Sequence, residues 1–356
     1  MQVDFLIIGQ GISGTWLSYY LKKEDRSFLV IDDHDQHASS RLAAGVINPV
    51  TGRRHVEVWM AGEILPFSRE AYSEMGIELG IRAISEKSII DFFPSAQMRV
   101  SFDQRVRERS DYVFDLVPPS WFHDTFQFDF GCGEIRPVYI AHLENILPAW
   151  RSELVLNNLL LEESFEYEHL EVKNEQVRYK NIIASHIIFC DGQQSADSPY
   201  FNRLPFAPNK GEILLAEIKD LDPAHIYKKG MMMVPLEEKG LWWIGSSYQW
   251  EFEDTLPTAA FREKTEALLK SWLKVPFTIT DHLAGIRPAT LERRPFVGTH
   301  PAYYRIALLN GMGTKGCSLA PYFAKQLSDL LCANKPILPE ADINRFRKIL
   351  SGTISS

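Results

Sequence analysis

Several features that would place this chain of 356 residues in a particular class are missing from it. No apolar run approaches the 18 or more residues that a membrane-spanning helix needs. The formal net charge is −8 at pH 7, so there is no general excess of positive charge for nucleic acid or anionic membranes. Nucleic acid is therefore not the expected partner. A local basic patch at Arg53-Arg54 or Arg293-Arg294 stays open, and with it a tRNA partner.

Cysteine is scarce and histidine is scattered. The four cysteines, Cys132, Cys190, Cys317 and Cys332, form no CxxC pair. The first structural unit begins at residue 3 and leaves no room for a signal peptide, so we expect free thiols in a cytoplasmic protein. The ten histidines form no HxH or HExxH arrangement. Residues 32–37 mix histidines with carboxylates, which is compatible with a metal, but we interpret them as a solvated loop and predict no metal.

What is present is an ordinary globular composition with one strong motif. Hydrophobic residues make up 45% and charged residues 24%, and the length suggests two domains with a large core. A short apolar run at residues 5–8 leads into Gly9-x-Gly11-x-x-Gly14 and then a helix-compatible segment, residues 15–23. A second apolar run, residues 28–31, ends at Asp32 and Asp33. This order predicts a βαβ dinucleotide-binding unit; the alternative is a βαβ turn without a ligand.

Each residue type in this unit has a physical role. Gly9 permits the tight turn after the strand, Gly11 lets the backbone approach a pyrophosphate, and Gly14 lets the helix pack against the sheet. The helix N-terminus offers N–H groups and the positive end of a dipole to the phosphates. We expect Asp32 to accept the ribose hydroxyls. Such units occur in both NAD- and FAD-binding folds, so the unit by itself does not select the cofactor.

The rest of the chain predicts two interleaved domains in a mixed α/β fold. We expect a Rossmann-like cofactor domain from residues 1–85, 131–204 and 280–356, and an antiparallel-sheet substrate domain from residues 86–130 and 205–279. Helical patterns cover residues 56–84, 257–273 and 318–331, and Pro137 to Arg151 is also interpreted as a helix because proline is tolerated in a first turn. Strands are predicted at residues 88–93, 112–116, 126–130, 184–192, 211–218, 231–235 and 241–247.

Two further segments are expected to approach the cofactor. Residues 38–52 are rich in small residues and glycine, which favours a chain packed against a flat cofactor over a helix followed by an irregular loop. Gly311-x-Gly313-x-x-Gly316 repeats the fingerprint between a strand and a helix. No second strand ending in an acid follows it, so we do not interpret it as a second dinucleotide site. Its helix N-terminus, with Lys315, can instead face the flavin pyrimidine edge, although a surface position is an equal alternative for this lysine.

These motifs together resemble the FAD-dependent amine and amino-acid oxidoreductases grouped with D-amino acid oxidase, glycine oxidase and sarcosine oxidase. The resemblance covers nearly the whole chain. Besides the first glycine motif and the loop from Ser39 to Pro49, it rests on Gly285-x-Arg287-Pro288, Pro295-Phe-Val-Gly298, Gly313-Thr-Lys-Gly316 and the hairpin at residues 234–245. It implies FAD as cofactor. The residues expected to contact FAD are Gly9, Gly11, Ile12, Ser13, Gly14, Asp32, Asp33, Ser40, Arg41, Ala44, Gly45, Cys190, Gly192, Arg287, Gly311, Gly313, Thr314, Lys315 and Gly316.

The resemblance also implies the reaction. Arg287 lies where the family places the arginine that binds a substrate carboxylate, which suits its planar fork; a structural ion pair is the alternative. Such enzymes oxidise the C–N bond of a small amine or amino acid by hydride transfer to flavin, with oxygen or another acceptor taking the electrons. Met232 would line the substrate pocket or pack in the core, and Tyr248 and Trp250 would cover the substrate or belong to an aromatic core. The predicted catalytic residues are Arg287, Lys315, Met232 and Tyr248.

No cysteine lies at the Gly-x-Arg-Pro segment, where the sarcosine oxidases attach their flavin, so non-covalent FAD is expected.

The sequence leaves three interpretations of the function. The leading interpretation is oxidation of a small carboxylate-bearing amine. A relative within the family removes a carboxymethyl group from a modified wobble uridine of tRNA, and Arg287 would serve that reaction too. The third is an FAD-binding protein without amine turnover.

Overall fold

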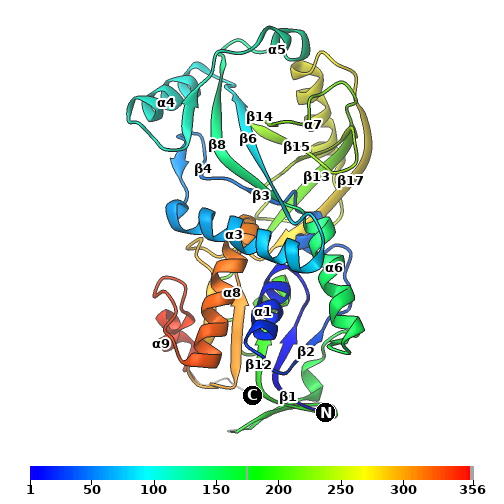
Figure 1. Ribbon diagram of the computed structural model, residues 1–356, viewed down its shortest axis with the longest axis vertical. Coiled ribbons are helices and arrows are strands. Elements are labelled where there is room, and N and C mark those ends of the chain that lie inside the picture. The colour runs from blue at the N-terminus through cyan, green and yellow to red at the C-terminus, as the bar shows by residue number, and fades with distance from the viewer. Residues whose placement is uncertain (174, 353–356) are drawn as a thin grey trace.

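The computed structural model describes residues 1–173 and 175–352. Figure 1 shows two lobes, with one β-sheet in the lower lobe and a second in the upper lobe. Helix α3 (Ala61–Leu79) crosses between them. Both the N-terminus and the C-terminal part of the chain lie in the lower lobe.

The first sheet is built around parallel strands. Strand β1 (Gln2–Ile8) lies between β2 (Phe28–Ile31) and β12 (Ile182–Phe189), parallel to both, and β19 (Ile306–Asn310) pairs in parallel with the end of β12. Because Ile8 pairs with both Ile31 and Phe189, the carboxyl ends of three neighbouring strands meet at one edge. The remaining strands of this sheet are β9 (Leu160–Leu161), β10 (Leu170–Val172), β11 (Val177–Tyr179) and β18 (Phe296–Thr299).

The second sheet is mostly antiparallel and draws on the middle of the chain. Its pairs are antiparallel except β14 with β6, which is parallel. Its strands are β3 (Val46–Ile47), β6 (Ile84–Phe92), β7 (Val113–Asp115), β8 (Cys132–Ala141), β13 (Asn209–Glu217), β14 (Ile226–Lys229), β15 (Met231–Pro235), β16 (Leu241–Gly245) and β17 (Thr278–Arg287). A separate two-stranded hairpin consists of β4 (Val50–Thr51) and β5 (Val56–Glu57).

The helices cover one face of the first sheet and the outside of the second. Helices α1 (Ile12–Lys23), α6 (Leu143–Leu156) and α8 (Gly316–Ala333) join α3 over the first sheet, and their shared core contains the buried Trp16 and Trp150. The other helical segments are α2 (Ser39–Leu42), α4 (Ala96–Arg107), α5 (Ser120–Thr125), α7 (Ala259–Trp272), α9 (Arg347–Leu350), η1 (Tyr167–His169), η2 (Gly192–Asp197), η3 (Gly313–Lys315) and η4 (Ile343–Phe346). Thr258 caps α7 by accepting a hydrogen bond from the N–H of Phe261, as an N-cap residue does.

The structure corrects two predictions around residue 130. The helix predicted from Pro137 is wrong at its start, because Pro137 lies within β8 and α6 begins at Leu143. The β6–β8 register is irregular opposite this proline, where the missing N–H removes no ladder bond. The strand predicted at residues 126–130 is also wrong. Phe126 makes only an isolated bridge to Leu273, and its ring packs against Phe92 and Trp272 in the core of the upper lobe.

Helices α4 and α5 were not predicted, and the strands mix the predicted domains. Strand β8 begins in a range assigned to the cofactor domain, yet it pairs with β6 in the second sheet. The division into two domains stays a prediction.

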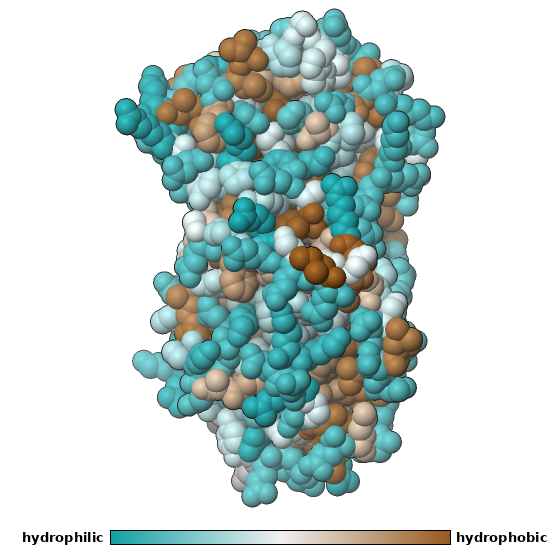
Figure 2. All heavy atoms as spheres, viewed as in Figure 1, coloured by the Kyte–Doolittle hydropathy of each residue, from teal (hydrophilic) through white to brown (hydrophobic). Residues whose placement is uncertain are grey.

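None of the helices in the described ranges has both the length and the hydropathy that a membrane crossing needs. Figure 2 shows a mostly hydrophilic face with small scattered apolar groups.

Candidate active site

A cavity runs from the carboxyl edge of the first sheet to the second sheet. Its lining includes the turn after β1, the end of β2, residues 190–194 after β12, Asn310 at the end of β19 and residues 312–317. From the second sheet it takes side chains of β13, β15, β16 and β17. Trp250 lines a separate open hollow instead, which contains none of the residues predicted to be catalytic or to bind the cofactor. The cavity is thus the place where segments far apart in the sequence converge.

Most of the predicted cofactor and catalytic residues line this cavity. The exceptions are Gly14, Arg41 and Gly311. The N–H of Gly311 is bonded to the side chain of Asn310, and Arg41 donates from Nε to the carbonyl of Asp35 at 3.1 Å. Gly14 lies behind the turn, where its role is packing. Whether the residues that line the cavity contact a cofactor stays a prediction.

The first glycine motif is required by backbone contacts. Gly9 has a φ of 95°, and a Cβ there would lie 2.7 Å from the carbonyl oxygen of Cys190. A Cβ on Gly14 would lie 1.9 Å from the carbonyl oxygen of Gly9. Any side chain at either position would therefore push the turn, α1 and β12 apart. Gly11 directly precedes α1 and leaves room for a ligand at the helix N-terminus.

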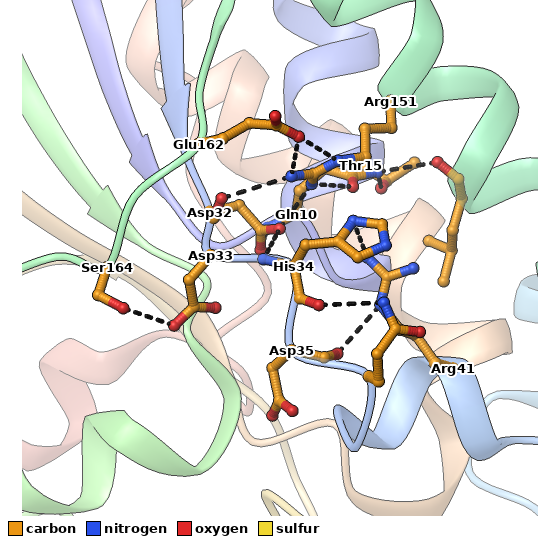
Figure 3. Close-up of polar contacts among 12 residues, drawn as sticks. Gln10, Thr15, Asp32, Asp33, His34, Asp35, Arg41, Arg151, Glu162 and Ser164 are labelled. Carbon is orange, nitrogen blue, oxygen red and sulfur yellow. Dashed lines mark hydrogen bonds and ion pairs between the residues drawn. The ribbon is translucent and has the colours of Figure 1, made fainter.

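The carboxylate of Asp32 is held from several sides (Figure 3). Its Oδ2 accepts the N–H of Gln10 at 2.8 Å, and its Oδ1 accepts the N–H of His34 at 3.0 Å. Arg151 of α6 forms an ion pair with Oδ1 at 2.6 Å and a second with Glu162 at 2.8 Å. These contacts fix Asp32 at the end of β2 while leaving Oδ2 with capacity for another donor. Arg151 was not predicted, because it lies 119 residues away in sequence.

Asp33 and the histidines of the same loop have other partners. Asp33 accepts a hydrogen bond from Ser164 Oγ at 2.8 Å, and Nδ1 of His34 lies 3.4 Å from Arg41. Among the residues that the structure describes, no group of three His, Cys, Asp or Glu side chains gathers as metal ligands do. The absence of a metal stays a prediction.

A half-buried acid was missed at the neighbouring strand end. The carboxyl group of Asp191 lines the cavity and accepts hydrogen bonds from Ser195 Oγ and from Asn310 Nδ2. Burial raises the pKa of Asp191 to about 7, which these hydrogen bonds only partly oppose. Asn310 also donates to the carbonyl of Gly192 at 2.8 Å and so joins the ends of β12 and β19. The sequence offered one signal for this pair: Asp191 closely follows strand β12, and Asn310 ends strand β19.

Arg287 ends β17 and reaches the cavity from the second sheet. Its Nη1 donates to Asn209 Oδ1 at 2.7 Å and to the carbonyl of Ser247 at 3.1 Å. Its Cζ lies 4.9 Å from the centre of the Tyr248 ring, a cation–π distance. No carboxylate in the described ranges pairs with it, so the interpretation as a structural ion pair is wrong. Burial lowers the pKa of Arg287, but a guanidinium keeps its charge in proteins.

The remaining predicted residues divide between cavity and surface. Met232 lines the cavity from β15 and also contacts the core of the upper lobe, so its core packing is confirmed and its role in a substrate pocket stays a prediction. Tyr248 and Trp250 are 61% and 57% exposed, so the interpretation as aromatic core is wrong for both. They lie on the segment that follows β16, beyond the packed part of the sheet.

Lys315 and Cys317 flank the start of α8 and both line the cavity. Burial, together with the nearby Arg294 and Arg293, lowers the pKa of Lys315 to about 8. Lys315 is thus partly buried and lines the cavity, and whether it faces a flavin stays a prediction. Burial raises the pKa of the Cys317 thiol to about 12, and all four cysteines are free. Within residues 1–173 and 175–352, no strand ending in an acid follows α8, in agreement with the rejection of a second dinucleotide site.

Known proteins resemble the chain over nearly its whole length. Glycine oxidase from Pseudomonas putida is 24% identical, covering 96% of this chain and 98% of that protein. Glycine oxidase from Bacillus subtilis is also 24% identical, covering 92% of each. In structure, iminodiacetate oxidase from Chelativorans sp. BNC1 has a TM-score of 0.77 at 16% identity, covering 96% of this chain and 98% of that one. Glycine oxidase from Geobacillus kaustophilus has a TM-score of 0.75 at 16% identity, covering 97% and 98%.

The family follows from the sequence match rather than from the fold alone. The model of the FAD dependent oxidoreductase family that includes D-amino acid oxidase matches residues 4–330. This range includes the glycine turn, Asp32, Arg287 and Lys315, which the structure brings to one cavity. The chain therefore belongs to the FAD dependent oxidoreductase family.

Proposed function

We propose that this enzyme oxidises the C–N bond of a small amine or amino acid that bears a carboxylate, using non-covalently bound FAD. The observation that carries the proposal is Arg287, a cavity-lining guanidinium without a carboxylate partner among the described residues. A partly buried cation without a counterion favours an anionic ligand. The relatives named as glycine oxidase and iminodiacetate oxidase support a carboxylate-bearing amine.

The residues around the cavity suit FAD. Gly9 and Gly11 line the cavity at the start of α1, and Asp32 lines it with an Oδ2 that has capacity to accept a hydrogen bond from a ribose hydroxyl. When bound, FAD supplies the oxidant that accepts hydride from the amine-bearing carbon and passes the electrons to oxygen or another acceptor. The buried thiol of Cys317, with its raised pKa, is a poor nucleophile, which supports non-covalent binding.

The protein contributes orientation and charge. Arg287 would bind the substrate carboxylate and thereby place the neighbouring carbon. Met232 and Tyr248 also line the cavity and would exclude water from the substrate. Lys315 would place positive charge at the N-terminus of α8, where the helix dipole has the same sign.

One observation favours the tRNA alternative. Thr51 lines the cavity, and the exposed Arg53 and Arg54 follow it at the tip of the β4–β5 hairpin. Two exposed arginines beside the cavity suit a phosphodiester backbone. Binding of tRNA that weakens steeply with added salt would favour this alternative.

An anaerobic reduction experiment tests the proposal. The FAD-loaded protein would be mixed without oxygen with glycine, sarcosine, D-amino acids and larger N-alkyl glycines, and the visible flavin spectrum recorded. Bleaching by one of these compounds is the expected result and would identify the substrate class. Readmitting air would then distinguish an oxidase from a dehydrogenase. Bound flavin that no compound bleaches would overturn the proposal in favour of tRNA or of a protein without turnover.

A further inference from the structure

The guanidinium of Arg287 offers one defined edge to a ligand. A guanidinium has five N–H donors, and the two on Nη1 are taken by Asn209 Oδ1 at 2.7 Å and by the carbonyl of Ser247 at 3.1 Å. Among the residues that the structure describes, no acceptor bonds to Nε or Nη2. Of the three remaining donors, Nε–H and one Nη2–H form the fork that matches a carboxylate bidentately. The occupied nitrogen thus determines which edge stays available.

Asn209 is placed to hold this arrangement from the neighbouring strand. It lies on β13 directly opposite Arg287 of β17 in the antiparallel register. Its side chain is only 1% exposed, and it is not among the residues that line the cavity. Asn209 therefore contacts Arg287 without itself lining the cavity. Its oxygen is neutral, so it accepts the hydrogen bond without cancelling the positive charge of the guanidinium.

Gly211 supplies the space in which the guanidinium lies. It is two residues from Asn209 and on the same face of β13. A Cβ at Gly211 would lie 1.8 Å from Nη2 and 2.2 Å from Cζ of Arg287. The guanidinium therefore rests directly on the Gly211 backbone, under the Tyr248 ring. Any side chain at this position would push the guanidinium out of place.

We propose that Asn209 is a positioning residue that, with Gly211, turns the Nε–Nη2 edge of Arg287 toward the substrate carboxylate. The inference rests on the proposed function, because it assumes that Arg287 binds an anion. It adds Asn209 and Gly211 of β13 to the site and explains why an asparagine and a glycine stand at these positions. An aspartate at position 209 would supply a competing carboxylate, and any residue larger than glycine at position 211 would take the space.

The test measures the binding of benzoate and acetate, which carry a carboxylate but no oxidisable amine. FAD-loaded wild type, Asn209→Asp, Gly211→Ala and Arg287→Ala would be titrated, and the perturbation of the flavin spectrum would give the dissociation constant. We expect Asn209→Asp and Gly211→Ala to raise it by about 10- to 100-fold. FAD content and the thermal unfolding midpoint should change little, because the clash in Gly211→Ala falls on the end of a flexible side chain.

The controls separate positioning from a general structural effect. Gly62→Ala makes the same substitution on α3, where the nearest contact would be 3.9 Å away, and it should leave the dissociation constant unchanged. In an Arg287→Ala background, Asn209→Asp should have no further effect, because its target is gone.

The outcomes distinguish this inference from the proposed function. If Arg287→Ala weakens benzoate and acetate binding while Asn209→Asp and Gly211→Ala do not, the positioning role is overturned and the proposed function survives. If Asn209→Asp weakens binding equally with and without Arg287, the effect is structural and the inference fails. If neither carboxylate binds the wild type, or Arg287→Ala binds them normally, the role of Arg287 fails and the inference fails with it.

Discussion

Arg151 of α6 and Asp32 at the end of β2 form a largely buried ion pair, with Nη1 and Oδ1 2.6 Å apart. Their side chains are only 8% and 13% exposed. The pair joins the glycine turn, through the bond from Gln10 N–H to Asp32, to a helix more than a hundred residues later. The acid expected to bind the ribose is thus held by a distant part of the chain.

Arg151→Met should destabilise the protein and weaken FAD binding. Removing one partner leaves the Asp32 carboxylate largely buried and without its cation, which costs about 3 kcal/mol. Urea unfolding of the apoprotein and FAD fluorescence quenching would measure the two effects. Glu153→Gln is the matched control, because Glu153 lies on α6 like Arg151 but forms an exposed ion pair, with Lys22 of α1. Its loss should cost less than about 1 kcal/mol. Equal losses in both variants would contradict this prediction.

Arg287→Lys should retain FAD but lose substrate affinity. Lysine keeps the charge but not the planar fork, so the bidentate contact is lost. We expect KM for a carboxylate-bearing substrate to rise by about 10-fold or more, with a smaller change in kcat. Steady-state kinetics on the FAD-loaded variant would measure both. Unchanged KM would show that the fork does not bind the carboxylate.

Lys315→Met should stabilise the apoprotein near neutral pH. Burial and two arginines lower the folded-state pKa of Lys315 from 10.5 to about 8. The unfolded chain therefore binds more protons between these two pH values. The free-energy cost of holding charged Lys315 in the folded protein is complete below pH 8 and disappears as pH rises toward 10.5. We expect a gain of roughly 1–3 kcal/mol at pH 7. Urea unfolding from pH 7 to 10 should show the gap between variant and wild type narrowing, and a constant gap would refute the prediction.

Asp191→Asn should have the opposite pH dependence. The folded-state pKa of Asp191 is raised from 3.8 to about 7, so the folded state binds more protons between these values. This destabilisation is absent below pH 3.8 and complete above pH 7. Asparagine keeps an acceptor for Ser195 and Asn310 without the charge. The variant should gain on the order of 2 kcal/mol at pH 8 and little at pH 4, as measured by urea unfolding at both values.

Local signals in the sequence predicted much of this architecture. Gly9, Gly11 and Asp32 were found because a strand, a turn and a helix follow each other directly in the sequence. This order alone shows at which positions a residue without a side chain is needed. The strands that carry Met232 and Trp243 were predicted from a local β-type pattern of apolar residues. Arg287 came from a family motif rather than from spacing.

Pairings between distant segments escaped prediction. Arg151, Asp191 and Asn209 depend on register and on which strand ends meet, and the sequence contains no spacing that reports either. Pro137 shows the same limit. Its local preference for a helix start was overridden by the pairing of β8 with β6, at a place where the ladder already had an irregularity.

The interleaved topology also sets an order of events during synthesis of the chain. The first residues that line the cavity are Ile8 and Gly9, and it is completed only by residues 312–317. A nascent chain that has formed β1, α1 and β2 therefore lacks β12, β19 and α8, against which the glycine turn must pack. We expect the early βαβ unit to have little affinity for a nucleotide by itself, so that FAD is captured by the released chain rather than by the growing one.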